Sequence, residues 1–165
     1  MLVESRNSEA YMGYELKHTV PHVSILGIGG AGCNIVSLMA KNGSEASILA
    51  LNSDARHLSV TKAEKRILLG YNTASGLGCM GFRERGARAA KESAGEIAKE
   101  LFGSQVIFIV AGLGGGTGTG AAPVVAEIAK SQGAAAIGVV TIPFQIEKTR
   151  WARAKEGLEA LIGVC

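Results

Sequence analysis

Residues 111–123 read AGLGGGTGTGAAP, and six glycines fall within the nine positions from 112 to 120. The segment before this stretch, QVIFIVAG at 105–112, is a continuous apolar run that predicts a strand buried on both faces. The segment after it, TGAAPVVAEIAKSQG at 119–133, has apolar residues at helical spacing and a terminating Gly133. A flexible linker would not join a buried strand to a packed helix. We therefore predict a tight loop whose backbone N–H groups converge at a helix start, which is an arrangement that binds anions such as phosphates.

The composition is that of a single globular domain. With 165 residues, of which 47% are hydrophobic and 19% charged, the chain can bury a substantial core. The formal net charge of +3 is small and the charges are interleaved, so we expect no nucleic acid partner. No apolar run reaches membrane-spanning length, so we expect no direct membrane insertion and a cytoplasmic location. The three cysteines (Cys33, Cys79 and Cys165) lack metal-ligand spacing and are expected to be reduced thiols.

Short apolar runs alternate with amphipathic segments along the chain. Strands are predicted at 22–28, 46–52, 66–70, 105–111 and 135–142. Helices are predicted at 31–43, 82–103 (with a break near Gly86 or Ser93), 119–132 and 147–162, with a helical turn near 54–60 and a turn-rich stretch at 71–81. Strands that alternate with helices form parallel sheets covered on both faces. We therefore predict an α/β fold, a Rossmann-like three-layer sandwich with a mainly parallel sheet, over residues 22–165, preceded by an extension at 1–21.

A second glycine-rich loop, GIGGAGCN, follows the first predicted strand. Gly27, Gly29 and Gly32 satisfy the GxGxxG pattern, and Asp54 lies just past the second predicted strand. Taken alone, this pattern favours an NAD-binding oxidoreductase domain. A second, denser glycine loop after the fourth strand instead suits a nucleoside triphosphate held from several sides. The sequence contains no GxxxxGK[ST] motif, so no P-loop lysine can neutralise the phosphates.

The glycine-rich stretch GLGGGTGTGAAP resembles the tubulin signature as it occurs in FtsZ, the prokaryotic tubulin-like GTPase family of cell division. The segments GIGGAGCN, LNSDARHL, GLGCMG and VVTIPF follow in the family's order, and the resemblance extends from about Val23 to Leu161. The resemblance implies the tubulin/FtsZ GTPase-domain fold. It also implies GTP or GDP as the ligand, Mg²⁺ bound through the phosphates, and subunits that polymerise into cytoskeletal filaments for septation in the cell cycle.

The resemblance also implies a set of nucleotide-binding residues. The first loop would contact the α- and β-phosphates and approach the base, through Gly29, Gly30, Ala31, Gly32, Cys33 and Asn34. The signature loop would hold the β- and γ-phosphates through its N–H groups and the hydroxyls of Thr117 and Thr119, over Gly114, Gly115, Gly116, Thr117, Gly118, Thr119 and Gly120. The loop that senses the γ-phosphate would contribute Cys79, Met80 and Gly81.

Three further positions are implied by the resemblance, and two of them have an alternative role. Asp54 matches a position near the nucleotide and its metal, and is equally suited to cap a helix. Glu147 matches an acidic ribose contact. Arg150 matches an arginine on the base or ribose side, with a surface ion pair as the alternative.

The resemblance implies no catalytic residue in this chain. In the family, acidic residues that activate water belong to a later part of the neighbouring subunit, so we expect this chain to bind nucleotide without efficient hydrolysis on its own. FtsZ subunits continue past the position of Cys165, and the sheet is expected to have an exposed edge that favours a dimer or a domain swap. Division proteins are expected as partners of the full-length protein. A short, non-catalytic FtsZ-like regulator is the further alternative.

Overall fold

The structure, a computed structural model, describes residues 21–165, so the predicted extension lies almost entirely outside the described residues. Five strands form one sheet in the order β3-β2-β1-β4-β5, and every neighbouring pair is parallel. The strands are β1 (Val23–Ile28), β2 (Ser47–Asn52), β3 (Lys65–Leu68), β4 (Val106–Gly112) and β5 (Ala135–Thr141). The prediction of a mainly parallel sheet is confirmed.

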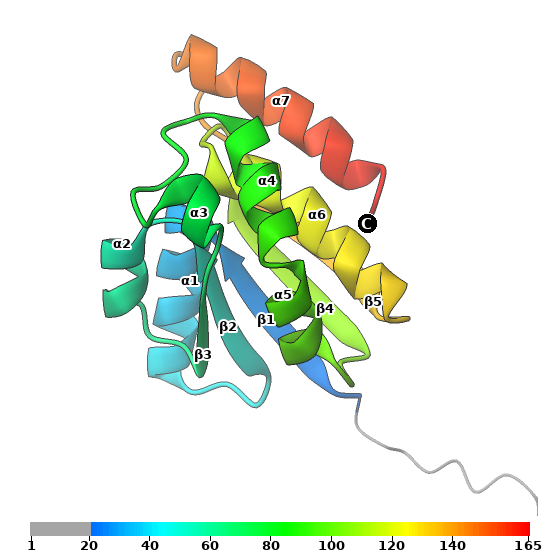
Figure 1. Ribbon diagram of the computed structural model, residues 1–165. Coiled ribbons are helices and arrows are strands. Elements are labelled where there is room, and N and C mark those ends of the chain that lie inside the picture. Colours follow the sequence, from blue (N-terminus) through cyan, green and yellow to red (C-terminus); the bar gives the residue numbers. More distant parts are fainter. Residues whose placement is uncertain (1–20) are drawn as a thin grey trace, which may run out of the picture.

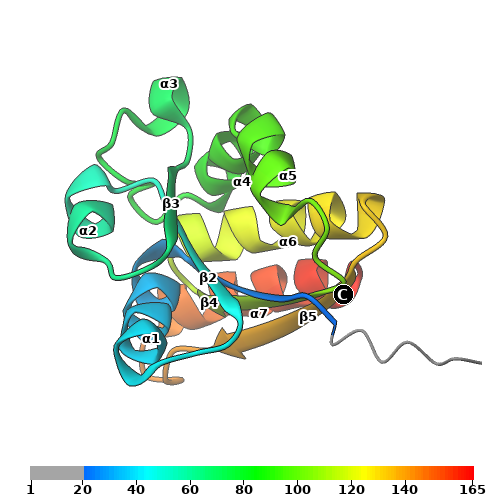
Figure 2. The same ribbon diagram turned by 90° about the horizontal axis from the view of Figure 1, so that it is seen from below.

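Helices cover both faces of this sheet. They are α1 (Gly29–Asn42), α2 (Ala55–Val60), α3 (Tyr71–Ala74), α4 (Arg83–Glu92), α5 (Ala94–Leu101), α6 (Thr117–Ser131) and α7 (Lys148–Ile162). In Figures 1 and 2, α1 lies on one side of the sheet, and α4, α5 and α6 lie on the other. The three-layer sandwich is therefore confirmed. None of the helices in residues 21–165 is both long enough and apolar enough to cross a membrane.

Alternating side chains of the strands supply two separate cores. Ile107 and Ile109 of β4 point to the larger core, where they meet the apolar faces of α5 and α6. Val110 of the same strand points to the smaller core beneath α1, with Val36 and Ile48. Because the central strands are buried on both faces, their sequences are continuous apolar runs. This is why these strands could be predicted from the sequence.

The long predicted helix at 82–103 is in fact two helices, and the break lies at Ser93 rather than at Gly86. Ser93 Oγ accepts a hydrogen bond from the Gly70 backbone N–H at 3.0 Å, so this serine connects the break to the end of β3. Gly86 lies within α4. The absence of a side chain there lets α4 approach the loop, because a Cβ would meet the Gly116 carbonyl oxygen. The turn-rich stretch at 71–81 contains the short helix α3, which the sequence did not predict.

Glu92, at the end of α4, holds the start of α3. Its two carboxylate oxygens accept hydrogen bonds from the backbone N–H groups of Asn72 and Thr73, at 2.8 and 3.0 Å, and from both of their side chains. The Thr73 hydroxyl is the largest cause of a lowered pKa for the Glu92 carboxyl, and the Asn72 N–H adds to it. The ionised form of Glu92 therefore attaches α3, and the loop that follows α3, to α4.

We expect Glu92→Gln to lower the melting temperature at neutral pH, because an amide cannot accept all of these hydrogen bonds. The folded-state pKa of Glu92 lies below its ordinary value of 4.5, so the carboxylate stabilises the fold above that pH. The difference in melting temperature between the wild type and the variant should disappear as the pH falls below that value. Thermal unfolding across a pH series measures this difference. Glu127→Gln, at an exposed position in the middle of α6, is the matched control, and an equal effect of both substitutions would contradict the assignment.

Candidate functional site

Two helices begin side by side at the end of the sheet where the carboxyl ends of the strands lie. β1 runs directly into α1, and β4 leads through the glycine-rich loop into α6. Because β1 and β4 are parallel neighbours, both helix starts lie at the same edge. The first-turn N–H groups of each helix have no acceptor within the helix, and both helix dipoles place partial positive charge there. The contact is close, since a Cβ on Gly29 would lie 2.9 Å from the Gly118 backbone nitrogen.

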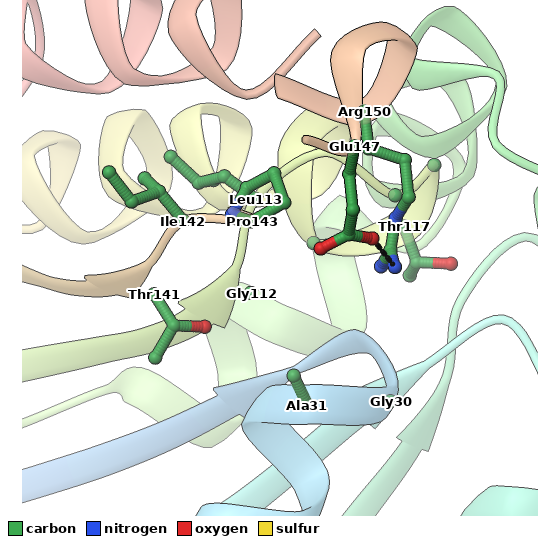
Figure 3. A pocket seen from close by; sticks show the side chains of 13 residues that line it. Gly30, Ala31, Gly112, Leu113, Thr117, Thr141, Ile142, Pro143, Glu147 and Arg150 are labelled. Carbon is green, nitrogen blue, oxygen red and sulfur yellow. Dashed lines mark hydrogen bonds and ion pairs between the residues drawn. The ribbon is translucent and has the colours of Figure 1, made fainter. Parts of the chain in front are cut away.

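A cavity of about 310 Å³ opens at this point (Figure 3). Its walls come from the start of α1, the glycine-rich loop with the start of α6, and the segment from the end of β5 to the first turn of α7. The lining residues are Gly30, Ala31, Gly112, Leu113, Gly115, Gly116, Thr117, Gly118, Thr141, Ile142, Pro143, Glu147 and Arg150. Five of these thirteen residues are glycines, so backbone atoms contribute directly to the cavity wall.

The glycines around the cavity fall into two groups. Gly116 and Gly118 are required by packing, because a Cβ would lie 2.7 Å from Cys79 Cβ in the first case and 2.6 Å from the Gly112 carbonyl oxygen in the second. Gly30 and Gly115 are different, since a Cβ on either would meet nothing within 4 Å. Both of these residues line the cavity. No contact within the protein requires glycine at these two positions, so the space beside them is available to a ligand.

Glu147 and Arg150 form an ion pair on the cavity wall. Arg150 Nη1 lies 2.8 Å from Glu147 Oε2, as the dashed line in Figure 3 marks. The other carboxylate oxygen of Glu147 accepts a hydrogen bond from the Phe144 backbone N–H at 3.3 Å. Arg150 thus forms an ion pair, which is its alternative role, while it also lines the cavity. Because the two charges offset each other, the wall presents little net charge, and an anion in the cavity would depend on the backbone N–H groups.

The structure brings only part of the predicted set together. Those on the cavity wall are Gly30, Ala31, Gly115, Gly116, Thr117, Gly118, Glu147 and Arg150. Those that do not line it are Gly29, Gly32, Cys33, Asn34, Asp54, Cys79, Met80, Gly81, Gly114, Thr119 and Gly120. The sequence analysis missed Gly112, Leu113, Thr141, Ile142 and Pro143. Their positions at the carboxyl ends of β4 and β5 are the signal that could have found them.

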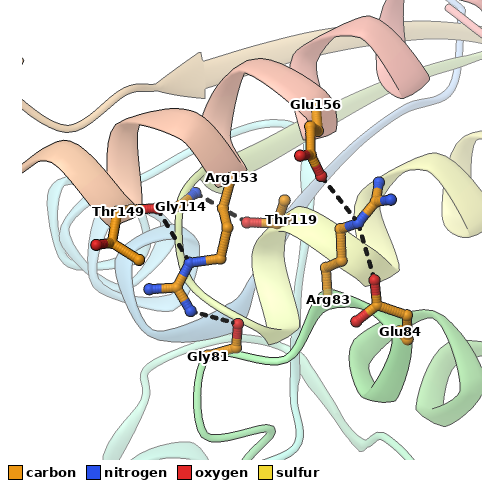
Figure 4. A network of polar contacts seen from close by, with 8 residues as sticks. All are labelled: Gly81, Arg83, Glu84, Gly114, Thr119, Thr149, Arg153 and Glu156. Carbon is orange, nitrogen blue, oxygen red and sulfur yellow. Dashed lines mark hydrogen bonds and ion pairs between the residues drawn. The ribbon is translucent and has the colours of Figure 1, made fainter.

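Thr119 and Gly120 make their observed contacts within the protein. The Thr119 side chain is 2% exposed, and its hydroxyl oxygen accepts a hydrogen bond from the Gly114 backbone N–H at 2.9 Å (Figure 4). This bond closes the glycine-rich loop on itself, so neither the Thr119 hydroxyl nor the Gly114 N–H points into the cavity. The Gly120 N–H donates to the Gly116 carbonyl at 3.1 Å, and a side chain at Gly120 would meet the Arg83 carbonyl oxygen of α4.

Cys33 and Gly32 serve the packing of α1 against the sheet. The Cys33 thiol is fully buried, 3.6 Å from the Gly27 carbonyl oxygen, and burial raises its pKa to about 11. The thiol is therefore protonated and behaves as a small apolar side chain. A side chain at Gly32 would meet the Val110 carbonyl oxygen of β4. The GxGxxG pattern thus serves partly to bring α1 close to its strands.

Asp54 caps α2, as its alternative role predicted. Asp54 Oδ1 accepts a hydrogen bond from the His57 backbone N–H at 3.0 Å. The His57 ring lies between two amide side chains, with Nε2 2.9 Å from Asn34 Oδ1 and Nδ1 3.1 Å from Asn52 Nδ2. In this arrangement Nε2 donates to Asn34 Oδ1 and Nδ1 accepts from the Asn52 amide. Asn34 and Asp54 are thus engaged in a network that links α1 to α2.

The loop at 76–82 is held from α7. Met80 and Gly81 both have positive φ, at 49° and 81°. Arg153 of α7 donates a hydrogen bond to the Gly81 carbonyl at 2.7 Å, and an ion pair joins Arg83 at the start of α4 to Glu156 of α7 at 3.3 Å (Figure 4). These contacts are the α7 clasp. The clasp fixes the position of this loop relative to α7. The start of α7, with Glu147 just before it and Arg150 in its first turn, forms part of the cavity wall.

No cluster of three or more metal-ligating side chains occurs in residues 21–165. A divalent cation at this site would therefore need most of its oxygen ligands from a bound phosphate or from water, as is usual for Mg²⁺.

Comparisons with known proteins give a consistent result. The model of the Tubulin/FtsZ family, GTPase domain, matches residues 22–165. Cell division protein FtsZ 1 of Archaeoglobus fulgidus is 49% identical over 150 residues, which are 90% of this chain and 40% of that relative. Cell division protein FtsZ 2 of Methanocaldococcus jannaschii is 44% identical over 144 residues, which are 87% of this chain and 38% of that relative. The chain thus spans about 40% of the length of the curated relatives it matches.

Solved structures agree with these sequence relatives. An empty FtsZ dimer from M. jannaschii matches with a TM-score of 0.87 and 47% identity, over 90% of this chain and 44% of that one. The GDP-bound monomer of CetZ1 from Haloferax volcanii matches with a TM-score of 0.78 and 25% identity, over 87% of this chain and 48% of that one.

The two groups of glycines should respond differently to alanine. Gly118→Ala should cost about 1–3 kcal/mol of unfolding free energy, because its Cβ would be forced against backbone that cannot move aside. Gly30→Ala should change the unfolding free energy by less than about 1 kcal/mol, because open space surrounds the new methyl group and alanine suits a helix. Urea denaturation of both variants measures the difference. Equal stability of the two variants would contradict the packing assignment.

Proposed function

Since the chain belongs to the Tubulin/FtsZ family, GTPase domain, we propose that it binds a guanine nucleotide, GTP or GDP, in the cavity at the ends of β1 and β4. The observation that carries this proposal is the pair of cavity glycines, Gly30 and Gly115, that face open space beside two helix starts. In the full-length protein, this part would serve a GTPase that polymerises into cytoskeletal filaments for cell division.

Phosphate recognition in this proposal depends on the backbone. First-turn N–H groups of α1 and α6, from Gly30, Thr117 and Gly118, can donate to phosphate oxygens. The Thr117 side chain lies on the cavity wall and adds a hydroxyl. The net charge of the cavity's paired side chains is close to zero, so the helix dipoles and a Mg²⁺ ion bound through the phosphates would offset the phosphate charge.

Glu147 is suited to a ribose contact. Its carboxylate is oriented by Arg150 on one oxygen and by the Phe144 N–H on the other, so it has a fixed position on the wall. Each carboxylate oxygen keeps a further lone pair that can accept a hydrogen bond from a ribose hydroxyl. Arg150 would then act on the ribose through Glu147, and not by direct contact.

Efficient hydrolysis would require a group that this chain does not place at the site. Glu147 is the single carboxylate among the described residues that line the cavity, and its ion pair with Arg150 lowers its ability to orient water. Phosphoryl transfer depends on positioning, charge stabilisation and an oriented nucleophile. We propose that the orienting carboxylate comes from a neighbouring subunit, so that this chain binds nucleotide and turns it over slowly when alone.

An NAD-binding oxidoreductase domain is the second candidate, on the strength of the GxGxxG pattern. In such domains an acidic residue after the second strand hydrogen-bonds the ribose. Asp54 occupies that place in the sequence, but its carboxylate caps α2 and does not line the cavity. The guanine nucleotide is therefore the better candidate.

Calorimetric titration with GTP, GDP, ATP and NAD in the presence of Mg²⁺ tests the proposal. We expect GTP and GDP to bind and ATP and NAD to bind at least tenfold more weakly, which corresponds to about 1.4 kcal/mol. Phosphate release from GTP should stay close to the uncatalysed rate when the chain is alone.

The variant that tests the cavity itself is Gly30→Ala, whose methyl group would occupy cavity space without disturbing the fold. This variant should lose nucleotide affinity about tenfold or more while it keeps its melting temperature. Tight binding of NAD, or unchanged GTP affinity in the Gly30→Ala variant, would contradict the proposed site.

We also propose that the chain associates with further copies of itself. β5 pairs only with β4 among the described strands, and its outward face carries Ile137 and Val139 at 42% and 48% exposure. An edge strand without charged side chains favours pairing between chains. Relatives of similar fold have been described as a dimer and, for CetZ2, as a protofilament.

Size-exclusion chromatography with light scattering tests this association. We expect a mass above that of one chain at high concentration, and Val139→Lys should shift the population toward the monomer because it places a charge on the edge strand. Val60→Lys, at an exposed position on α2, is the control and should leave the mass unchanged. A strict monomer at every concentration would overturn the proposed self-association.

A further inference from the structure

Three polar side chains from three separate segments of the chain meet in the interior beside the cavity. Ser53 follows β2, Cys79 lies in the loop at 76–82, and Thr117 begins α6. Their exposed fractions are 0%, 2% and 9%. Ser53 Oγ lies 2.6 Å from Thr117 Oγ1 and 3.2 Å from Cys79 Sγ. Thr117 is the member of this trio that lines the cavity.

Either hydroxyl can donate in the Ser53–Thr117 hydrogen bond, and the Cys79 thiol favours the direction in which Ser53 donates. The Cys79 thiol donates to Ser53 Oγ, and a thiol is a poor acceptor in return. Ser53 has one proton, which is then available for Thr117 Oγ1, and their 2.6 Å separation is that of a strong O–H···O bond. With its oxygen accepting from Ser53, Thr117 keeps its own proton for another acceptor. The cavity is where that acceptor would lie.

The backbone around Ser53 reinforces this arrangement. The Ser53 carbonyl accepts a hydrogen bond from the Gly78 N–H at 3.0 Å, and Asp54 forms an antiparallel bridge with Leu77. The loop at 76–82 thus holds Ser53 by its main chain and, through Cys79, by its side chain.

We propose that Ser53 is a positioning residue for nucleotide binding. It fixes Thr117 as an acceptor, so that the Thr117 hydroxyl proton is directed at a phosphate oxygen in the cavity. Ser53 itself does not touch the ligand. The proposal rests on the proposed function and deepens it, because it connects the conformation of the loop at 76–82 to the strength of one phosphate contact.

A double-mutant cycle tests this role. Ser53→Ala, Thr117→Val and the double variant are titrated with GTP and with GDP. Thr117→Val should weaken binding of the more sensitive nucleotide about tenfold, and Ser53→Ala about three- to tenfold, because each removes or misdirects one hydrogen bond to a charged group. The double variant should bind no more weakly than Thr117→Val alone. Ser53→Thr, which keeps the hydroxyl, should restore affinity relative to Ser53→Ala.

Ser24→Ala is the matched control. Ser24 is 1% exposed and its hydroxyl lies 2.8 Å from that of Ser104, at the opposite end of β1 from the cavity. This variant should lose stability as Ser53→Ala does and keep wild-type nucleotide affinity. If Ser53→Ala binds as tightly as Ser24→Ala, or if the effects of Ser53→Ala and Thr117→Val add, the positioning role is wrong. Wild-type protein that binds no guanine nucleotide would instead overturn the proposed function, and the positioning role with it.

Discussion

Backbone contact between the starts of α1 and α6 is the constraint on which the rest of the structure depends. Gly29 and Gly118 approach so closely that a Cβ on Gly29 would lie 2.9 Å from the Gly118 nitrogen, and a Cβ on Gly118 would press against the Gly112 carbonyl. This contact fixes how far apart the two sets of first-turn N–H groups lie. It also fixes the direction in which α6 leaves the sheet, and therefore where α4 and α7 can pack on it.

The cavity that results is an electrostatic site made largely without charged side chains. Its ion pair, Glu147 with Arg150, contributes little net charge, whereas the helix starts contribute oriented dipoles held in place by the fold. Such dipoles require no side chain to reorganise when a ligand binds. This explains why the glycine-rich stretch, and not a lysine, is the prominent feature of the sequence.

Most of the fold was predictable from the sequence, because buried parallel strands are apolar on both faces and because the helices end at recognisable residues. The break at Ser93 could be placed only approximately, since the bond that explains it joins Ser93 to Gly70, a residue distant in sequence. The site was less predictable. Thr119 and Thr117 look alike in the sequence, yet the Thr119 hydroxyl closes the loop on Gly114, whereas Thr117 lines the cavity and its hydroxyl bonds Ser53. Ile142 and Pro143 reach the cavity only because β5 lies next to β4.

The α7 clasp has a consequence for the response of the cavity to solution conditions. The walls formed by α1 and α6 are held by buried backbone contacts. α7 packs on α6 through Gly157 and the buried Leu161, and its further contacts are the part-buried Arg153–Gly81 hydrogen bond and the solvent-exposed Arg83–Glu156 ion pair. Dissolved salt screens exposed charges over about 8 Å at physiological ionic strength and leaves buried packing almost unaffected. Ionic strength therefore acts on the Arg83–Glu156 contact of α7 and leaves the backbone contact between α1 and α6, and the buried face of α7, almost unaffected.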